Sequence, residues 1–351
     1  NAPVATTLQG ISAFPASHPL HTGLSFGPSA VPAAENAFKQ CDVMLAVGTR
    51  FGEIGTGSFG VKVPSNLIHI DINPHALNAN YPAKVAIAGD ARHVLTALWS
   101  ALQATSAPPN LRGDVRDQIR RDKEAYLQEW YRHDSRERVN PALFFKGLRK
   151  QLRDDAFVVV DDGNHTFLAA ELMPIHGARK FISPTDFNCM GYCVPAAIAT
   201  KLANRDKQVV GIVGDGAFTM TCMEIITAAT HKLGAIFFVF HDGELSQISQ
   251  AQEIPYNRKT CTVIGKLDVS GVARATGGRF LALEHNSQID DVIAKALQLA
   301  GEGIPVVVDV NIDYSKRTRF TEGIVKTNLM RFPLNAKARF IGRALMRRVK
   351  E

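Results

Sequence analysis

Short apolar runs alternate with helical patterns along most of this chain. In the first hundred residues, apolar runs that close near a Gly or an Asp occupy 42–49, 66–72 and 84–91. Helical patterns lie at 29–40 and 91–104. Apolar strands with helices between them indicate a parallel sheet that is covered on both faces.

The same alternation starts again near Asn140. The stretch 140–152 is predicted to be a helix, with Asn140 as its N-cap and Pro141 at its first helical position. Further strands are predicted at 156–162, 207–216, 235–242, 279–284 and 304–312, and further helices at 221–233, 268–277 and 287–300. We therefore expect a second sheet of the same kind.

A turn-rich segment at 105–114 and a charged helical pattern at 115–135 separate the two sets of strands. The predicted fold class is α/β, with two doubly wound parallel-sheet domains joined by a helical linker and followed by a basic C-terminal tail. The predicted boundaries are 1–105 for the first domain, 106–138 for the linker, 139–315 for the second domain and 316–351 for the tail.

The composition is that of an ordinary globular protein. Of 351 residues, 46% are hydrophobic and 21% are charged. No apolar run approaches the roughly 20 residues of a membrane-spanning helix, and the first residues show no signal peptide. The five cysteines show neither a paired framework nor zinc spacing, so we expect reduced thiols and a cytoplasmic location.

The net charge of +7 is concentrated in the tail. The stretch 316–351 holds eleven Lys or Arg and two Glu, which leaves the rest of the chain with a net charge of −2. A nucleic-acid partner is therefore not expected. The tail also carries apolar residues that favour packing on the protein or on a partner subunit over a membrane surface, namely Phe340, Ile341, Leu345 and Val349.

Two acidic residues follow neighbouring predicted strands. Asp215 lies between Gly214 and Gly216, and Asp242 ends the next strand. Ligands of open parallel sheets bind at the carboxyl ends of strands, and the amides of Gly216, Ala217 and Phe218 open a helix that favours an anion. Because Asp215 would repel a bare phosphate, we predict Mg²⁺ between them, held by Asp215, Asp242 and the carbonyl of Glu244.

Several stretches resemble thiamine diphosphate (ThDP) enzymes of the acetolactate synthase type. The glycine-flanked Asp215, the sequence PTDFNCMGYCVPAAIATKLA at 184–203 and DGNHTF at 162–167 are similar to that family's cofactor-binding motifs. The opening stretch and the segments 41–53, 69–77 and 86–91 resemble the family's central domain. The resemblance covers about 1–315.

The resemblance implies ThDP and Mg²⁺ as cofactors and a lyase or transferase reaction. The substrate would be a 2-keto acid or a related carbonyl compound, which is decarboxylated, ligated or cleaved. Asn164 and His165 would reach the diphosphate. Asn188 and Met190 would meet the aminopyrimidine through backbone groups, and the Met190 side chain would lie between the two cofactor rings. The family usually has two Asn residues where this chain has His241 and Asp242.

The resemblance also indicates where substrate selection occurs. After the metal turn, the family carries Met, Val and Trp in its acceptor pocket, and the corresponding residues here are Gln247, Ile248 and Ala251. A pocket without the large aromatic wall should not select the same 2-keto acids. Gln247 remains open to a second interpretation, as a polar residue on the solvent side of a helix.

In this family a Glu that activates the cofactor lies on an N-terminal pyrimidine-binding domain, which precedes the part that this chain resembles. We therefore expect no catalytic residue on this chain, and little or no activity from it alone. The missing domain would be a separate chain or a fragment lost by cleavage or truncation. Because the cofactor normally lies between subunits, a homo-oligomer, dimer or tetramer, is expected.

The first domain leaves several alternatives open. The sequence GTGSFG at 55–60 fits the G-x-G-x-x-G dinucleotide pattern, but it neither follows a strand directly nor opens a helix. The family's central domain sometimes binds FAD near the position of Arg50, so FAD, ADP or no nucleotide are all open. Two other functions remain: a non-enzymatic FAD- or ADP-binding regulatory module, and an NAD-dependent Rossmann dehydrogenase.

Overall fold

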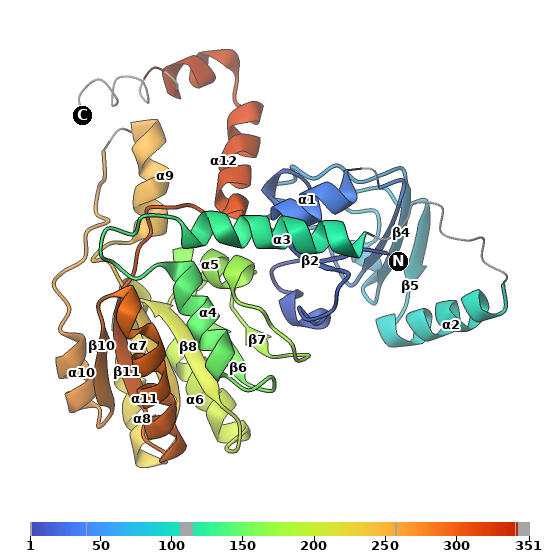
Figure 1. Cartoon of the computed structure of the whole chain (residues 1–351). Helices are drawn as coiled ribbons and strands as arrows, with labels where there is room; N and C mark the ends of the chain where they lie inside the picture. The colour runs from blue at the N-terminus through green and yellow to red at the C-terminus, as the bar shows by residue number, and fades with distance from the viewer. Residues whose placement is uncertain (1, 40, 106–114, 257, 341, 343–351) are drawn as a thin grey trace. The chain divides into compact units, whose positions relative to one another are not determined.

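The computed structural model describes residues 2–39, 41–105, 115–256, 258–340 and 342. They form two compact units, which Figure 1 shows in one view. Unit 1 comprises Asn1–Gly10, His18–Ala125 and Arg319–Met330, and unit 2 comprises Ile11–Ser17, Tyr126–Thr318 and Arg331–Glu351. Among the described residues, no helix is both long and apolar enough to cross a membrane.

Unit 2 is built on a six-stranded sheet in the order β10-β11-β9-β8-β6-β7. Every neighbouring pair in this sheet is parallel. The strands are β6 (Phe157–Val160), β7 (Phe181–Ile182), β8 (Val209–Gly214), β9 (Ile236–His241), β10 (Arg279–Leu283) and β11 (Val306–Asn311). The structure thus confirms the predicted parallel sheet and adds β7, which at two residues is too short to leave an apolar run.

Helices cover both faces of this sheet, as Figure 1 shows. Phe237 and Val239 of β9 join a hydrophobic cluster with α6 (Cys193–Ala203), α7 (Asp215–Thr221), α8 (Ile225–Thr230) and α10 (Val269–Ala275). The alternate residues Phe238 and Phe240 pack edge-on against Phe144 of α4 (Pro141–Gln151), with ring centroids 5.1 Å apart. Successive strand residues point to opposite faces, so both faces of β9 are buried.

Unit 2 also contains the helices α5 (Asn164–Leu172), α9 (Ser246–Tyr256) and α11 (Ile289–Gly301), and α11 lies beside α4. Helix α4 begins where it is predicted to begin: Asn140 Oδ1 accepts hydrogen bonds from the amides of Ala142 and Leu143, with Pro141 at the first helical position. This confirms the N-cap prediction.

The stretch 221–233, predicted as one helix, is broken in the structure. Helix α7 ends at Thr221, a 3-10 turn covers Cys222–Glu224, and α8 follows. At Thr221 the backbone has φ −138° and ψ 9°, outside the helical region. Its hydroxyl donates to the carbonyl of Gly191 at 3.0 Å, so a tertiary hydrogen bond accompanies the break.

Unit 1 contains two parallel sheets. One pairs β1 (Val4–Thr6) with β2 (His21–Leu24), and the other has the order β3-β4-β5. The strands of the second sheet are β3 (Val43–Val47), β4 (Asn66–Asp71) and β5 (Val85–Ala88). The α-helices of unit 1 include α1 (Pro32–Phe38), α2 (Ala91–Gln103) and the charged α3 (Arg116–Tyr131). Helix α3 continues into unit 2. Phe26, Met44, Phe51 and Leu67 form the centre of the core of unit 1.

The dinucleotide-like stretch 55–60 has no dinucleotide-binding geometry. A 3-10 turn (Ile54–Thr56) precedes a run of turns, and no helix opens there. The stretch therefore opens no helix, as the sequence predicts.

Part of the predicted basic tail belongs to the folded body. Helix α12 (Arg319–Arg331) belongs almost entirely to unit 1, where Thr327 lies so close to Gly60 that an added Cβ would come within 2.5 Å of its hydroxyl. Phe340 contacts Phe332, with centroids 5.0 Å apart. The other apolar tail residues named above, Ile341, Leu345 and Val349, lie outside the described residues, as do linker residues 106–114.

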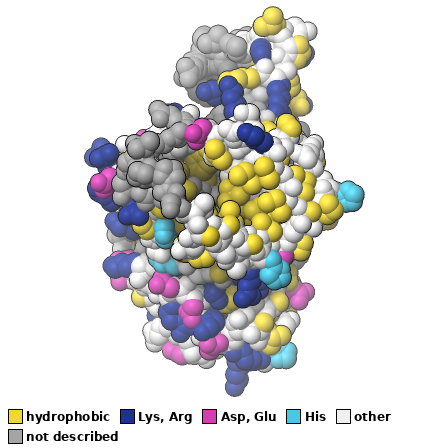
Figure 2. Space-filling model, turned by 90° about the vertical axis from the view of Figure 1, so that its right-hand side faces the viewer, with side chains coloured by type: hydrophobic (Ala, Val, Ile, Leu, Met, Phe, Trp, Pro, Cys, Tyr) yellow, Lys and Arg dark blue, Asp and Glu magenta, His cyan; other side chains and the backbone are white. Residues whose placement is uncertain are grey.

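Unit 1 exposes apolar side chains on its three-stranded sheet and on α2. Val43 and Leu45 of β3 are 51% and 43% exposed, and Trp99 of α2 is 64% exposed. Figure 2 shows a broad group of hydrophobic side chains on the face that it draws. Contiguous exposed apolar area is typical of a surface that another polypeptide covers.

Candidate functional site

A cavity of about 110 Å³ lies in unit 2 where the strands β6, β8 and β9 end. These are carboxyl ends of parallel strands, where the sequence predicts a ligand. Most of the predicted site residues line it: Asn164, His165, Met190, Gly214, Asp215, Gly216, Ala217, Asp242, Glu244, Gln247 and Ile248.

Asp215 occupies the first position of α7 and is 2% exposed. Its Oδ1 accepts from the amide of Gly216 at 2.7 Å, and its Oδ2 accepts from the amides of Gly243 at 2.7 Å and Asp242 at 3.2 Å. Burial raises the pKa of this carboxyl, and the three amides oppose that rise. The carboxylate therefore fixes the turn after β9 against the start of α7.

Asp242 follows β9 directly and lies next to Asp215. Burial raises its pKa to about 6, with the charge of Asp215 adding to the rise, and the Ser246 hydroxyl donates to its Oδ2. Two carboxyl groups that are both desolvated and adjacent repel each other when ionised. A cation between them would remove that repulsion.

Glu244 lines the cavity, yet its carboxylate is already paired. Lys259 Nζ lies 2.8 and 3.0 Å from its two oxygens, and the Ser249 hydroxyl donates to it at 2.9 Å. This arrangement fits the expectation that Glu244 contributes a backbone carbonyl and not its side chain.

The donor set fits a hard divalent cation that shares its coordination sphere with a ligand. No group of three or more His, Cys, Asp or Glu side chains in the described part of the chain is placed to hold a metal by itself. The cavity offers two carboxylates and a backbone carbonyl. Mg²⁺ prefers such oxygens and usually takes its remaining ligands from water and from substrate phosphates.

His165, in the first turn of α5, is a buried neutral side chain at the cavity. Its ring is only 4% exposed and lies so close to Gly163 and Gly214 that a Cβ on either would come within 2.7 and 3.1 Å of Cε1. Burial lowers its pKa to about 3, which keeps the ring neutral. Nε2 has no hydrogen-bond partner among the described residues, and buried polar atoms of this kind usually have one.

Three predicted residues do not line the cavity. The Phe218 side chain is fully buried in the hydrophobic cluster, because that side of α7 faces the sheet. Asn188 is exposed in a loop at φ 57°, and Ala251 is exposed one turn further along α9 from Gln247. The Gly216 amide, predicted to face the ligand, is instead bonded to Asp215.

Sequence reasoning missed three residues at or beside the cavity. Asp161, just after β6, accepts hydrogen bonds from backbone amides next to Met190. In the sequence it is marked only as an acidic residue at the end of a strand. Tyr314 lines the cavity, and burial raises its pKa well above the usual value; nothing in the sequence marks it. His241 lies 2.9 Å from Asp309 Oδ1 and 3.9 Å from Asp215 Oδ2, and the Asp309 hydrogen bond raises its pKa.

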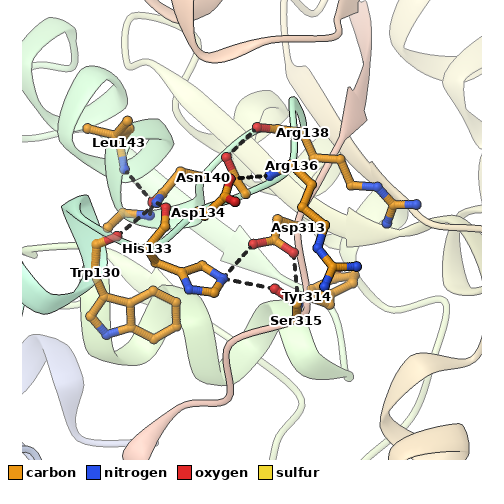
Figure 3. Close-up of polar contacts among 12 residues, drawn as sticks. Trp130, His133, Asp134, Arg136, Arg138, Asn140, Leu143, Asp313, Tyr314 and Ser315 are labelled. Atoms are coloured by element: carbon orange, nitrogen blue, oxygen red, sulfur yellow. Dashed lines mark hydrogen bonds and ion pairs between the residues drawn. The ribbon is translucent and has the colours of Figure 1, made fainter. Parts of the chain in front are cut away.

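A second polar cluster, drawn in Figure 3, joins the end of α3 to the segment after β11. His133 Nε2 lies 2.8 Å from the Ser315 hydroxyl and 3.0 Å from Asp313 Oδ2. Both contacts use the same ring nitrogen, whereas a Ser-His-Asp triad uses one ring nitrogen for each partner. Asn140 Nδ2 donates to the Trp130 carbonyl at 2.8 Å, so the cluster fastens the end of α3 that belongs to unit 2.

Comparison with known families shows which protein family the chain belongs to. Residues 1–98 match the family model described as thiamine pyrophosphate enzyme, central domain. Residues 161–310 match the model described as thiamine pyrophosphate enzyme, C-terminal TPP binding domain. The chain belongs to the thiamine pyrophosphate enzymes. This confirms the resemblance indicated by the motifs around Met190 and Asp215.

Curated relatives of this thiamine pyrophosphate enzyme include acetolactate synthases. It is 29% identical to acetolactate synthase isozyme 3 large subunit of Escherichia coli (strain K12), over 90% of this chain and 55% of that protein. It is 31% identical to the acetolactate synthase large subunit of Corynebacterium glutamicum, over 72% of this chain and 40% of that protein. The probable large subunit of Methanocaldococcus jannaschii is 29% identical over 89% and 53%. The chain spans about half the length of the curated relatives it matches.

Proposed function

We propose that this chain supplies the metal- and diphosphate-binding half of a ThDP site in an enzyme that acts on a 2-keto acid or a related carbonyl compound. One observation carries the proposal. Asp215 and Asp242, at the ends of neighbouring strands, lie side by side in a cavity that also presents Met190 and the unpartnered Nε2 of His165.

The chain's own groups divide the work of binding. Asp215 and Asp242, with the carbonyl of Glu244, would hold Mg²⁺, and Asn164 and His165 would contact the diphosphate. When bound, ThDP supplies the carbanion-stabilising chemistry. Asp215 and His165 are buried at the inner end of the cavity, where charge interactions are stronger than in water.

Met190 provides an apolar support in the same cavity. Its Cε lies 3.6 Å from the position that a Cβ on Gly216 would take, and Leu245 lies closer still. We propose that this thioether packs against the cofactor rings and that Gly216 is glycine because the cofactor, Met190 and Leu245 leave no room for a side chain.

The substrate end of the cavity is polar but carries no positive charge. Gln247 and Ile248 line it, and no Lys or Arg is among its described lining residues. A second carboxylate on a substrate would meet no Lys or Arg of this chain there. The neutral side-chain amide of Gln247 can instead form hydrogen bonds with a hydroxyl or a carbonyl group. We therefore propose that the part of the substrate that faces Gln247 is uncharged, so that selection differs from that of the acetolactate synthase type.

The activating Glu is proposed to lie outside this sequence. Glu244 is the one glutamate among the described lining residues, and its carboxylate is paired with Lys259. We propose that another polypeptide segment completes the site, in a homo-oligomer. The exposed apolar side chains of unit 1 support an assembly of this kind.

Calorimetric titration of ThDP into the chain, with and without Mg²⁺, tests the proposal. We expect binding that requires Mg²⁺ and that Asp215→Ala abolishes. Asp268→Ala is the control, because Asp268 is an aspartate of the same unit that caps α10 and does not line the cavity. Binding that is independent of Mg²⁺, or that survives Asp215→Ala, would contradict the proposal.

A further inference from the structure

We propose that Asp161 and Thr221 are positioning residues that fix the Met190–Gly191 peptide, and thereby the place of the Met190 side chain in the cavity. The inference rests on the proposed ThDP function. It assigns a role to two residues that neither contribute to the cavity lining nor hold the metal.

Asp161 is itself held rigidly. It follows β6, is fully buried, and its amide donates to the Ile212 carbonyl of β8 at 2.9 Å. The Thr166 hydroxyl donates to its carbonyl from the first turn of α5. With its backbone bonded to β8 and α5, the Asp161 carboxylate has a defined position.

The carboxylate of Asp161 is aimed at the loop that carries Met190. Oδ1 accepts from the amide of Gly191 at 2.9 Å, and Oδ2 accepts from the amide of Cys193 at 2.7 Å. Oδ1 also accepts from its neighbour Asp162 at 2.9 Å. A buried carboxylate is costly unless hydrogen-bonded, and these three amides supply that compensation.

Thr221 holds the other polar group of Gly191. Its hydroxyl donates to the Gly191 carbonyl at 3.0 Å. Gly191 has φ +85°, and a Cβ there would come within 3.2 Å of Met220 and 3.3 Å of Thr221. The loop therefore passes tightly against the end of α7, in a conformation that favours glycine.

These bonds act directly on Met190. The Gly191 amide belongs to the peptide unit that leaves Met190, so the Asp161 bond orients the plane of that peptide. Thr221 ends the helix that Asp215 begins. The short α7 thus runs from the proposed metal carboxylate to the residue that holds the Gly191 carbonyl.

The test separates contacts with the cofactor rings from contacts with its diphosphate. Dissociation constants of ThDP and of inorganic diphosphate, both with Mg²⁺, are measured by calorimetry for the wild type and for Asp161→Asn. This substitution keeps one side-chain oxygen as an acceptor and replaces the other with an NH₂ group, which cannot accept a hydrogen bond from a backbone amide. We therefore expect the ThDP affinity to fall roughly tenfold. Diphosphate affinity should stay unchanged, because in the proposed arrangement Met190 contacts the rings of the cofactor and not its diphosphate.

Three further variants make the result specific. Met190→Ala should lower the ThDP affinity selectively in the same way, and combining it with Asp161→Asn should add little further loss. Thr221→Val should give a smaller selective loss of about threefold, and it serves if Asp161→Asn does not fold. Asp268→Asn, which changes a carboxylate that accepts the Gly271 amide at 2.9 Å and does not line the cavity, should leave both affinities unchanged.

Equal losses for ThDP and diphosphate in both Asp161→Asn and Thr221→Val would show that these residues only support the fold, and would overturn the inference. Unchanged ThDP affinity in the two variants would overturn it as well. A wild-type chain that binds neither ligand would instead overturn the proposed function, and this inference with it.

Discussion

At the scale of single residues, the site depends on two aspartates. The sequence predicts that they lie close together, but it does not predict which residues surround them. Asp215 and Asp242 end strands that pair in parallel, so their meeting follows from the strand order. Asp161 contacts the Met190 loop through bonds between residues 30 and 32 positions apart. Such partners depend on how the loop folds back, which neither periodicity nor local motifs encode.

Asp242 should lower the stability of the metal-free protein at neutral pH. Its folded pKa of about 6 lies above the ordinary value of 3.8, so the folded state binds its proton more tightly than the unfolded state. The destabilisation is therefore complete above about pH 6 and disappears as pH falls towards 4. Asp242→Asn should raise the free energy of unfolding by about 2 kcal/mol at pH 8 and by much less at pH 4.

Urea unfolding of the metal-free wild type and Asp242→Asn at both pH values measures this difference. Asp309→Asn offers a comparison, because Asp309 is a carboxylate near the site whose partner is His241. An equal effect of Asp242→Asn at the two pH values would show that the Asp242 charge is not the cause.

Gly216→Ala should block the cavity without unfolding unit 2. The added Cβ would come within 2.6 Å of Leu245 Cδ2 and 3.6 Å of Met190 Cε. Because the closer neighbour is the end of a flexible side chain, we expect it to shift into the cavity. ThDP affinity should fall about tenfold or more, while the unfolding transition moves by less than about 1 kcal/mol.

Gly265→Ala is the matched control for that substitution, since a Cβ there meets no atom within 4 Å. Retained ThDP affinity in Gly216→Ala would mean that the cofactor does not use this part of the cavity.

At the scale of elements, the sequence predicts the strands and helices that have uninterrupted patterns and misses those set by tertiary contacts. The apolar run 235–242 becomes β9, and the helix predicted to start at Pro141 does so. The helix predicted at 221–233 is broken beside a Thr221 hydroxyl that reaches Gly191. Strand β7 has two residues and exists through pairing with β6, which single-segment patterns do not reveal.

Asn140 connects α4 to the end of α3, so its loss should affect more than a helix end. Its Oδ1 caps α4, and its Nδ2 donates to the Trp130 carbonyl. Asn140→Ala should lower the free energy of unfolding by about 2 kcal/mol, from the lost cap and an unpaired buried carbonyl. Asn140→Asp should retain the cap and recover part of that loss.

Thermal or urea unfolding of the two variants provides the measurement for Asn140. A loss in Asn140→Ala below about 0.5 kcal/mol would show that water replaces both hydrogen bonds.

At the scale of the whole molecule, unit 2 carries the proposed site while the chain spans about half the length of its curated relatives. The family and the fold class follow from sequence motifs and are confirmed. The division into two units is less regular than the linear boundaries suggest, because Ile11–Ser17 belongs to unit 2 and most of α12 to unit 1. Such exchanges depend on surface packing that apolar periodicity does not encode.

The 351-residue chain alone, supplied with ThDP and Mg²⁺, should bind the cofactor yet turn over no 2-keto acid. The described cavity lining presents no unpaired glutamate that could activate the cofactor. Product analysis with a panel of 2-keto acids whose side groups are uncharged, hydroxylated or carry a second carboxylate checks this expectation. Robust turnover would show that the acid–base group lies on this chain after all.

The central claim is that a divalent cation bridges Asp215 and Asp242. Anomalous diffraction from crystals grown with ThDP and Mn²⁺ in place of Mg²⁺ tests it most directly. We predict one anomalous peak within coordination distance of a carboxylate oxygen of each aspartate, next to the diphosphate. A peak elsewhere, or ThDP bound with no metal between these two side chains, would contradict the claim.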